Sequence, residues 1–167
     1  MYLYLYDNQL SGPIPAGLGS LSELFYLYLE NNQLSGVIPP QLGNLNNLNY
    51  LRLDHNQLSG SIPLEIGNMI GLRRLNLSLN QLTGSIPTEL SHLSNLYYLY
   101  LENNRLSGSI PPELGQIKLR ELKLKANQLT GGIPEGLFES WNWNVKILDI
   151  SSNKLKGRIP YELTNLN

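Results

Sequence analysis

Cysteine is absent from this chain of 167 residues. Its absence excludes a disulfide framework, a thiolate zinc site and a cysteine nucleophile, and it leaves the redox compartment unmarked. An excess of charge of one sign is also lacking, because 12 Lys and Arg stand against 13 Asp and Glu, for a formal net charge of -1. Nonspecific binding to nucleic acid or to an anionic membrane needs a broad basic field. We therefore expect no nucleic-acid partner.

Long hydrophobic runs are missing as well. No segment approaches the roughly 18 apolar residues of a membrane span, and Met1 leads into Tyr2 without the basic and apolar regions of a signal peptide. We expect no membrane span, and these residues alone leave a cytoplasmic location open. A hydrophobic fraction of 41% with 15% charged residues is too apolar for a disordered tail. The length then predicts a single folded domain over residues 1–167.

An internal repeat organises the whole chain. Leu-x-Leu pairs such as Leu51 and Leu53 alternate across a strand, which predicts one short strand per unit with its leucines in the core. Glycines such as Gly60 suit tight bends, and the following Ile-Pro pair imposes extended backbone. An asparagine after each predicted strand has an amide that can satisfy backbone groups at the turn. These asparagines are spaced by 24, 24, 24, 24, 23 and 26 residues, at Asn8, Asn32, Asn56, Asn80, Asn104, Asn127 and Asn153.

The repeat frame resembles a known family. The pattern Leu-x-x-Leu-x-Leu-x-x-Asn-x-Leu-x-Gly-x-Ile-Pro, as in Leu96 to Pro111, is similar to the plant-type leucine-rich repeat and covers essentially the whole chain. The resemblance implies an α/β repeat solenoid, a right-handed superhelix with a concave parallel sheet of about seven short strands and an irregular or 3-10 convex side. Receptor-kinase ectodomains and polygalacturonase-inhibiting proteins belong to this subclass. The resemblance therefore implies an extracellular location and a ligand on the concave face, but fold alone does not choose the ligand.

The two ends depart from that family. Extracellular members usually carry cysteine-bearing caps over the first and last coils, and the cysteine-free sequence has neither. We therefore expect a domain of about seven repeats that is truncated at both ends, with Tyr2 to Tyr6 as an uncovered first strand. The last coil is predicted to stop unfinished near Leu163. Because an exposed edge strand invites pairing with another chain, we expect a fragment, a trimmed chain, or a protein that covers its uncapped ends by self-association.

The outward positions of the predicted strands carry tyrosines and charged side chains. Tyrosine and arginine often dominate the binding energy of interfaces, so the sequence predicts a non-catalytic module that binds a protein or peptide. Two alternatives remain open: the tyrosines pair across strands only to stabilise the sheet, or they stack against the sugar rings of a cell-wall carbohydrate. The candidate binding residues are Tyr4, Tyr6, Tyr26, Tyr28, Glu30, Tyr50, Arg52, Asp54, Arg74, Asn76, Tyr98, Tyr100, Glu102, Lys123 and Lys125.

Repeated hydroxyls occupy the side predicted to face away from the sheet. Flat rows of this general kind occur in ice-binding solenoids, so ice binding (antifreeze activity) is an alternative function. The competing interpretation is that Ser-Gly-Ser is ordinary turn chemistry. These hydroxyl rows consist of Ser35, Ser59, Ser61, Thr83, Ser85, Ser107, Ser109 and Thr130.

Catalysis, metal binding and cofactor binding find little support. Glu30 and Asp54 are adjacent in one column, and paired carboxylates can do acid-base work or hold calcium. We expect Arg52 and Arg74 to neutralise them on an open, solvated face without a pocket that excludes water. The two histidines share no column, and the glycines follow the repeat rather than a phosphate-binding pattern. We therefore expect no enzyme activity, no metal site and no cofactor.

Two units break the period. The sixth is one residue shorter between Gly115 and Leu119, and the seventh is two residues longer and contains Trp141 and Trp143. We expect one of these tryptophans to fill the buried position that Leu45 holds in the third unit, with the other exposed.

Overall fold

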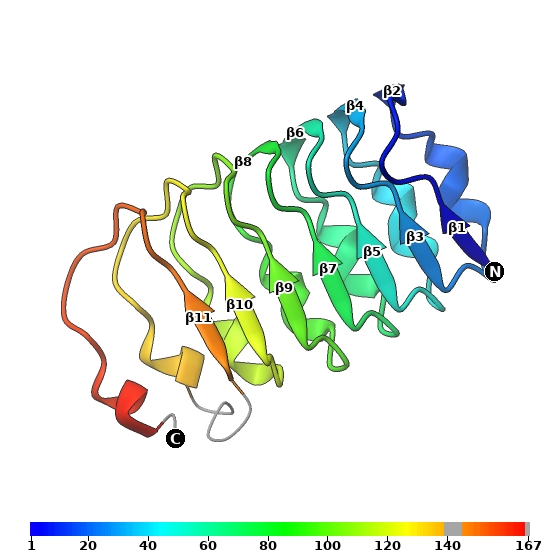
Figure 1. The fold of residues 1–167 in the computed structure, drawn as a ribbon. Coiled ribbons are helices and arrows are strands. Elements are labelled where there is room, and N and C mark those ends of the chain that lie inside the picture. The colour runs from blue at the N-terminus through cyan, green and yellow to red at the C-terminus, as the bar shows by residue number, and fades with distance from the viewer. Residues whose placement is uncertain (139–144, 166–167) are drawn as a thin grey trace.

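Seven parallel strands line the concave side of a curved solenoid (Figure 1). The computed structural model describes residues 1–138 and 145–165, so the predictions for Trp141 and Trp143 lie outside the described residues. Neighbouring strands pair in the repeat register, as in Leu27 with Leu51, which confirms the predicted concave sheet. In spatial order the strands are β1 (Tyr2–Tyr4), β3 (Tyr26–Tyr28), β5 (Tyr50–Arg52), β7 (Arg74–Asn76), β9 (Tyr98–Tyr100), β10 (Glu121–Lys123) and β11 (Ile147–Asp149).

A second parallel sheet follows the repeat asparagines of the first four coils, where segments such as Ser59-Gly60-Ser61 are predicted to form ordinary turns. Gly60 adopts a φ of 74°, which lets the backbone bend while it continues to bond to the neighbouring coil. The Gln33 N–H, for example, donates to the Leu10 carbonyl at 2.8 Å. The strands of this sheet are β2 (Ser11–Pro13), β4 (Gln33–Val37), β6 (Gln57–Ser61) and β8 (Gln81–Thr83).

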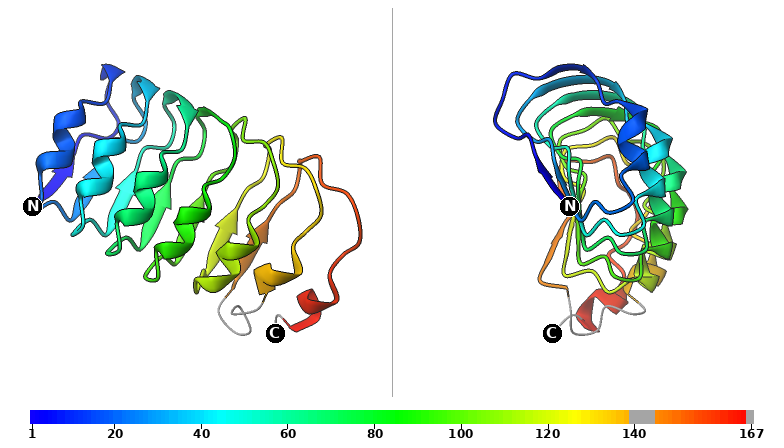
Figure 2. Two further views of the ribbon diagram at one scale, coloured as in Figure 1. Left: turned by 180° about the vertical axis from the view of Figure 1, so that it is seen from behind. Right: turned by 90° about the vertical axis from the view of Figure 1, so that its right-hand side faces the viewer.

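Short 3-10 helices stack along the convex side, opposite the concave sheet (Figure 2). Pro63 precedes the third of them with φ −65°, a value that the proline ring fixes and that leads the chain into the helix. In the part of the chain that the structure describes, no helix is long and apolar enough to cross a membrane. The helices are η1 (Ala16–Ser20), η2 (Pro40–Asn44), η3 (Leu64–Asn68), η4 (Thr88–His92), η5 (Pro112–Gln116), η6 (Glu135–Phe138) and η7 (Tyr161–Asn165).

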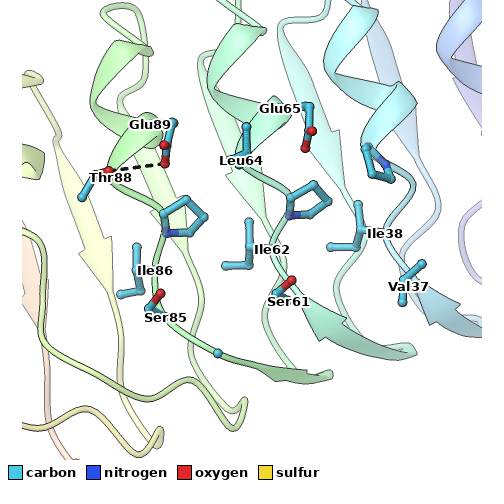
Figure 3. A pocket seen from close by; sticks show the side chains of 14 residues that line it. Val37, Ile38, Ser61, Ile62, Leu64, Glu65, Ser85, Ile86, Thr88 and Glu89 are labelled. Atoms are coloured by element: carbon cyan, nitrogen blue, oxygen red, sulfur yellow. Dashed lines mark hydrogen bonds between the residues drawn. The ribbon is translucent and has the colours of Figure 1, made fainter.

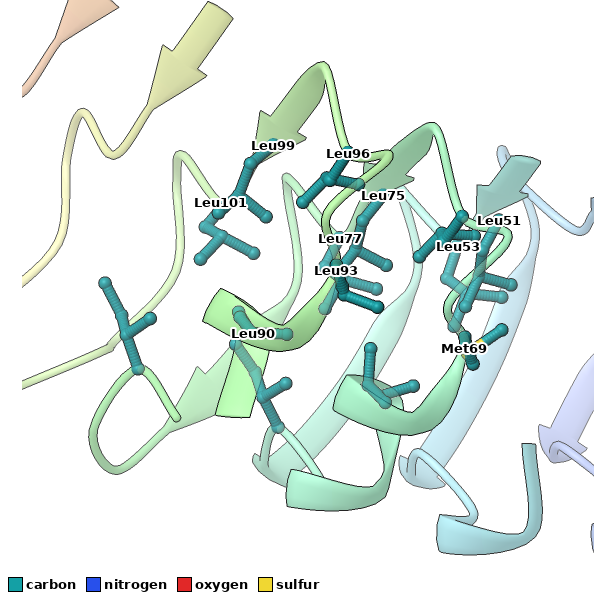
Figure 4. Packing of buried hydrophobic residues seen from close by; sticks show 14 of the residues in the cluster. Leu51, Leu53, Met69, Leu75, Leu77, Leu90, Leu93, Leu96, Leu99 and Leu101 are labelled. Atoms are coloured by element: carbon teal, nitrogen blue, oxygen red, sulfur yellow. The ribbon is translucent and has the colours of Figure 1, made fainter. Parts of the chain in front are cut away.

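Leucines from successive coils form one continuous core between the concave sheet and the 3-10 helices (Figure 4). Leu51, Leu53, Leu75 and Leu77 have no measurable exposure to solvent. Burial of each such side chain contributes roughly 1.5–3 kcal/mol. The predicted inward direction of the Leu-x-Leu pairs is therefore confirmed for the central coils.

The repeat asparagine joins adjacent coils through its side-chain amide. Asn80 Nδ2 donates to the carbonyls of Leu53 at 3.0 Å, Leu77 at 3.2 Å and Ser78 at 3.1 Å. Its Oδ1 accepts from the Leu58 N–H of the preceding coil at 2.9 Å. The predicted role of the amide is thus confirmed, and it extends across the boundary between two coils. The pattern recurs at Asn32, Asn56, Asn104, Asn127 and Asn153.

The residue before each repeat asparagine adopts left-handed backbone. Leu79, for example, has a φ of 53° although its side chain is 40% exposed. Branched apolar residues are disfavoured in this region, whereas Asn and Asp tolerate it. Because the Leu79 side chain is not buried, core packing gives no reason for a leucine at this left-handed position. The residues in this column are Asp7, Asn31, His55, Leu79, Asn103, Ala126 and Ser152.

We expect Leu79→Asn to raise the free energy of unfolding by about 1 kcal/mol, because Asn accepts the left-handed conformation that strains Leu. Urea denaturation measures the change as a higher midpoint with an unchanged slope. The reverse substitution Asn103→Leu, in the same column, should lower stability by a similar amount. Equal midpoints for Leu79→Asn and wild type would show that the backbone is not strained at this position.

Candidate binding face

A continuous aromatic surface covers the concave side of the first three coils. The tyrosine rows arise because each strand places its outward positions beside those of the next strand, as in Tyr2 with Tyr26 and Tyr26 with Tyr50. The ring centroids of these two pairs lie 4.8 Å and 4.7 Å apart. The rings thus pair across strands and still present area to solvent, since Tyr4 is 51% exposed. This tyrosine patch comprises Tyr2, Tyr4, Tyr6, Tyr26, Tyr28 and Tyr50.

Arg74, in the centre of the concave face, stacks on the tyrosines of the next strand. Its Cζ lies 4.6 Å from the ring centroid of Tyr98 and 5.6 Å from that of Tyr100. Within residues 1–138 and 145–165, the ion pairs involve Arg52, His55 and Lys123, and none involves Arg74. Its buried Nε also has no hydrogen-bond partner. The guanidinium is held in place by aromatic faces and keeps donors for an incoming acceptor.

Two predicted binding residues, Glu30 and Asp54, are buried, each only 3% exposed. The prediction of a solvated face was wrong here, because Arg52 lies across both carboxylates. Its Nη1 is 3.0 Å from Glu30 Oε1 and its Nε is 3.5 Å from Asp54 Oδ1, while its Cζ lies 5.6 Å from the centroid of Tyr28. Arg74, which we expected to help neutralise them, is engaged by the tyrosines instead. Burial raises the pKa of the Glu30 carboxyl even though Arg52 opposes the shift.

Asn76 is also buried, with 8% exposure, although it occupies an outward position of β7. Its Oδ1 accepts from the Ser78 N–H at 3.1 Å and from the Ser78 hydroxyl at 2.8 Å. The Ser78 side chain is buried as well. The Asn76 side chain is therefore buried and hydrogen-bonded to Ser78 rather than extended toward solvent, in contrast to its predicted place on the binding surface.

The fifth and sixth coils bring a tyrosine, an acid and a cation together. The Tyr100 hydroxyl donates to Glu121 Oε2 at 2.7 Å, and Lys123 Nζ lies 3.6 Å from the same oxygen and 4.6 Å from the centroid of Tyr100. Burial, with help from the bond to Glu121, raises the pKa of Tyr100 well above its usual range. The side chain of Lys125, two residues after Lys123, is exposed to solvent. Lys123 and Lys125 thus stand among the carboxylates of Glu102, Glu121 and Asp149, so cations and acids are mixed on this part of the face.

Glu102 has a buried oxygen without a hydrogen-bond partner, and burial raises the pKa of its carboxyl. The folded chain therefore binds this proton more tightly than the unfolded chain does. The carboxyl weakens the fold as pH rises through the window between its ordinary and its raised pKa, and the penalty persists above that window.

We expect Glu102→Gln to raise the melting temperature at pH 7 by about 2 °C. In acid, where the carboxyl is protonated in both states, the substitution should have no effect, so the two melting curves should converge. Calorimetry across pH measures the difference. The exposed Glu23→Gln serves as a control, and an equal gain for both variants at neutral pH would contradict the burial argument.

The hydroxyl rows run along the second sheet and the coils that continue it. Ser59 Oγ, Ser107 Oγ and Thr130 Oγ1 donate to glycine carbonyls of the preceding coil at 3.4 Å, 3.5 Å and 3.3 Å. Part of the row thus bonds within the solenoid rather than toward solvent. Ser35 and Ser59 are half-buried, and the remaining members are exposed: Ser61, Thr83, Ser85, Ser107, Ser109 and Thr130.

Among the described residues, no group of three or more His, Cys, Asp and Glu side chains could hold a metal ion. The acidic pair of Glu30 and Asp54 is instead occupied by the guanidinium of Arg52.

Sequence reasoning missed the stacking of Arg74. The signal that could have revealed it is the position of Tyr98, which follows Arg74 by one repeat and is its direct partner in the sheet register. An arginine beside a tyrosine in neighbouring strands is within reach of a cation–π contact.

Comparisons with known proteins place the chain among repeat proteins. A family model described as "Leucine rich repeat" matches residues 1–58, and a second, "Leucine Rich Repeat", matches residues 71–93, 95–117, 118–139 and 144–166. No curated protein gives a significant sequence match.

Solved structures resemble the chain over nearly its whole length. The plant peptide hormone receptor RGFR1 in complex with RGF2 has 34% identity and a TM-score of 0.90, over 99% of this chain and 30% of that chain. The Arabidopsis receptor kinase HAESA, in complex with the peptide hormone IDA and the co-receptor SERK1, has 38% identity and a TM-score of 0.91, over 98% of this chain and 27% of that chain. A plant ice-binding protein has 30% identity and a TM-score of 0.69, over 98% of this chain and 68% of that chain.

The chain thus spans 30% or less of the length of these two receptor structures. The family matches agree with the 24-residue frame and with the stacked coils. The chain belongs to the leucine-rich repeat family and resembles the ectodomains of plant receptor kinases.

Proposed function

We propose that the concave face binds an extended peptide, or an extended loop of a protein, and that the chain is a non-catalytic recognition module. The observation that carries this proposal is Arg74, a cation fixed on Tyr98 and Tyr100 that makes no ion pair with the carboxylates of the described residues. A cation held in this way, beside a partly exposed aromatic surface, is suited to anchor a ligand.

The charges on the face suggest how a ligand lies. Arg52 offsets Glu30 and Asp54, so the tyrosine patch mainly offers amphipathic aromatic area with few rotatable bonds. In the described part of the chain, Arg74 offers positive charge without an ion pair, whereas Lys123 is paired with Glu121. The aromatic or apolar part of a ligand is therefore expected over β1 to β5, with its acidic or hydrogen-bond-accepting part beside Arg74 on β7.

Similarity supports the class of partner. The structures that resemble this chain include a peptide hormone receptor and a receptor kinase in complex with a peptide hormone, so a peptide ligand and an extracellular location are the proposals that fit best. Binding of a cell-wall carbohydrate to the tyrosine patch and self-association through the ends stay as predictions from the sequence. A glycan array run beside a peptide selection distinguishes the first of these from peptide binding.

The triple variant Tyr28→Ser, Tyr50→Ser, Tyr100→Ser tests the proposal. Peptides are first selected from a displayed random library on the immobilised wild-type chain. Because aromatic anchors contribute about 1–2 kcal/mol or more each, the triple variant should bind these peptides at least about 100-fold more weakly while circular dichroism shows an intact fold.

Tyr161→Ser provides the matched control, since Tyr161 is 80% exposed but belongs to η7 rather than to the concave sheet. It should bind the selected peptides as wild type does. Undiminished capture by the folded triple variant would refute a concave binding face.

Ice binding is a second candidate function, and the similarity to a plant ice-binding protein is the observation that favours it. The exposed members of the hydroxyl rows would form the ice-contacting surface. A single Thr83→Tyr substitution would disturb that surface and should abolish inhibition of ice recrystallisation, whereas the concave triple variant should retain it. If the wild-type chain does not inhibit recrystallisation, this candidate is eliminated.

A further inference from the structure

A groove lies on the convex side, away from the concave face, where the strands of the second sheet lead into the 3-10 helices η2, η3 and η4 (Figure 3). It has a volume of about 680 Å³ and is lined by three consecutive coils. Its lining repeats Ile-Pro pairs such as Ile62 and Pro63, which are buried. Each of the three coils thus contributes an isoleucine and a proline to the lining.

Two exposed apolar side chains border this surface. Val37 is 58% exposed and Leu64 is 55% exposed. The next coils carry Ser61 and Thr88 at the corresponding positions, so the fold does not require an apolar residue at either place. Because both side chains line the same groove, they add exposed apolar area to one site, as at interaction sites rimmed by polar groups.

The groove also carries negative charge that the chain leaves uncompensated. Glu65 and Glu89 stand in the first turns of η3 and η4, and Figure 3 shows both beside the groove. Across the described ranges, no Lys, Arg or His forms an ion pair with either of them, and the residues that line the groove include no cation. Glu89 Oε2 accepts only the Thr88 hydroxyl, at 3.3 Å. A positively charged segment of a ligand would therefore complement both carboxylates.

The length of the groove limits the occupant. Strands β4, β6 and β8 are consecutive in one sheet, and a spacing of about 4.8 Å between strands makes three coils span roughly 10 Å. An extended peptide covers this distance with about three residues. We propose that the groove binds a short extended segment of a partner protein in which apolar residues stand next to lysine or arginine. The apolar side chains contact Val37 and Leu64, and the cations face Glu65 and Glu89.

A subtractive selection tests this assignment separately from the concave face. A displayed library of random dodecapeptides is depleted on the immobilised variant E65Q/E89Q and then selected on the wild-type chain. The surviving peptides should combine Lys or Arg with Val, Leu, Ile or Pro. As synthetic peptides they should bind wild type about tenfold more tightly than E65Q/E89Q, because two partly exposed charge pairs are lost. Val37→Ser should weaken binding as well.

Two controls keep the result specific to the groove. Glu135→Gln removes an exposed carboxylate from η6, outside the groove, and should bind the selected peptides as wild type does. The concave triple serine variant should also bind them undiminished, so failure of the proposed concave function leaves this test intact. Thermal unfolding of E65Q/E89Q near the wild-type temperature verifies the fold.

Three results would overturn the proposal. The first is that no peptide survives depletion, or that the survivors are acidic or uncharged. The second is equal affinity of wild type, E65Q/E89Q and Val37→Ser for the survivors. The third is a dimer, seen by light scattering of the chain alone, that E65Q/E89Q abolishes, because the groove would then belong to a second copy of this chain.

Discussion

Asn80→Ala is expected to lower the free energy of unfolding by about 3–4 kcal/mol, among the largest effects of any single substitution here. The amide donates to three buried carbonyls, and its oxygen accepts from the Leu58 N–H. Alanine would leave these backbone groups without partners and without water, and two adjacent coils would lose one of their connections. Chemical denaturation of purified variants measures the loss.

The chain offers a matched comparison in Asn8→Ala. Asn8 is exposed, and its side-chain amide donates to the Leu5 and Tyr6 carbonyls of its own coil. Water can replace those bonds, so we expect a loss of about 1 kcal/mol or less. Similar losses at both positions would contradict the idea that the asparagine acts as a buried bridge between coils.

Gly67→Ala is expected to destabilise the chain by about 3 kcal/mol through overpacking between coils. A Cβ at this position would lie 2.4 Å from the Glu89 carbonyl oxygen and 2.8 Å from the Glu89 Cβ. Since the first contact is with backbone, the convex stack of η3 on η4 would have to open. The melting temperature should fall by several degrees, which calorimetry detects directly.

The opposite sign is expected for Gly17→Ala. A Cβ there would meet nothing within 4 Å, and alanine restricts the unfolded chain more than glycine does. The variant should be unchanged or more stable by up to about 1 kcal/mol. A comparable loss at Gly17 would mean that glycine in these 3-10 helices serves backbone conformation rather than close approach of the coils.

The features of the fold that could be predicted from the sequence are those that the same residue type specifies at the same position of every repeat. Leu51 and Leu75 follow the same inward rule in adjacent strands, and Asn56 and Asn80 make the same bridging bonds. A period that holds over seven units fixes which positions face inward, because a strand has only two faces. The concave position of the tyrosines follows from the same rule.

The second sheet could not be predicted in this way. Gly36 and Gly60 suggest turns by their conformational freedom, yet positive φ is compatible with a chain that continues to bond to its neighbours. Whether such a segment becomes a turn or a strand depends on how closely the preceding coil stacks. That distance is set by the whole convex side rather than by the local sequence.

Burial of Glu30 and Asp54 also lay beyond the repeat pattern. Period assigns them outward positions, but their exposure depends on one long side chain, that of Arg52, which folds over both carboxylates and reaches Tyr28. Arg74, in the neighbouring strand, turns toward Tyr98 instead. Repeat spacing predicts the direction in which a Cβ points. The contacts of long side chains such as Arg52 then decide which neighbouring groups are exposed to solvent.

A photo-crosslink from the concave face tests the central claim most directly. One variant carries benzoylphenylalanine in place of Tyr50. A second carries it in place of Ile70, which is 60% exposed and lies outside the concave strands. Each variant is irradiated with a peptide that was selected on the wild-type chain and whose binding is insensitive to E65Q/E89Q. The account predicts a covalent adduct from position 50 and none from position 70. An adduct from position 70 alone would contradict binding on the concave face.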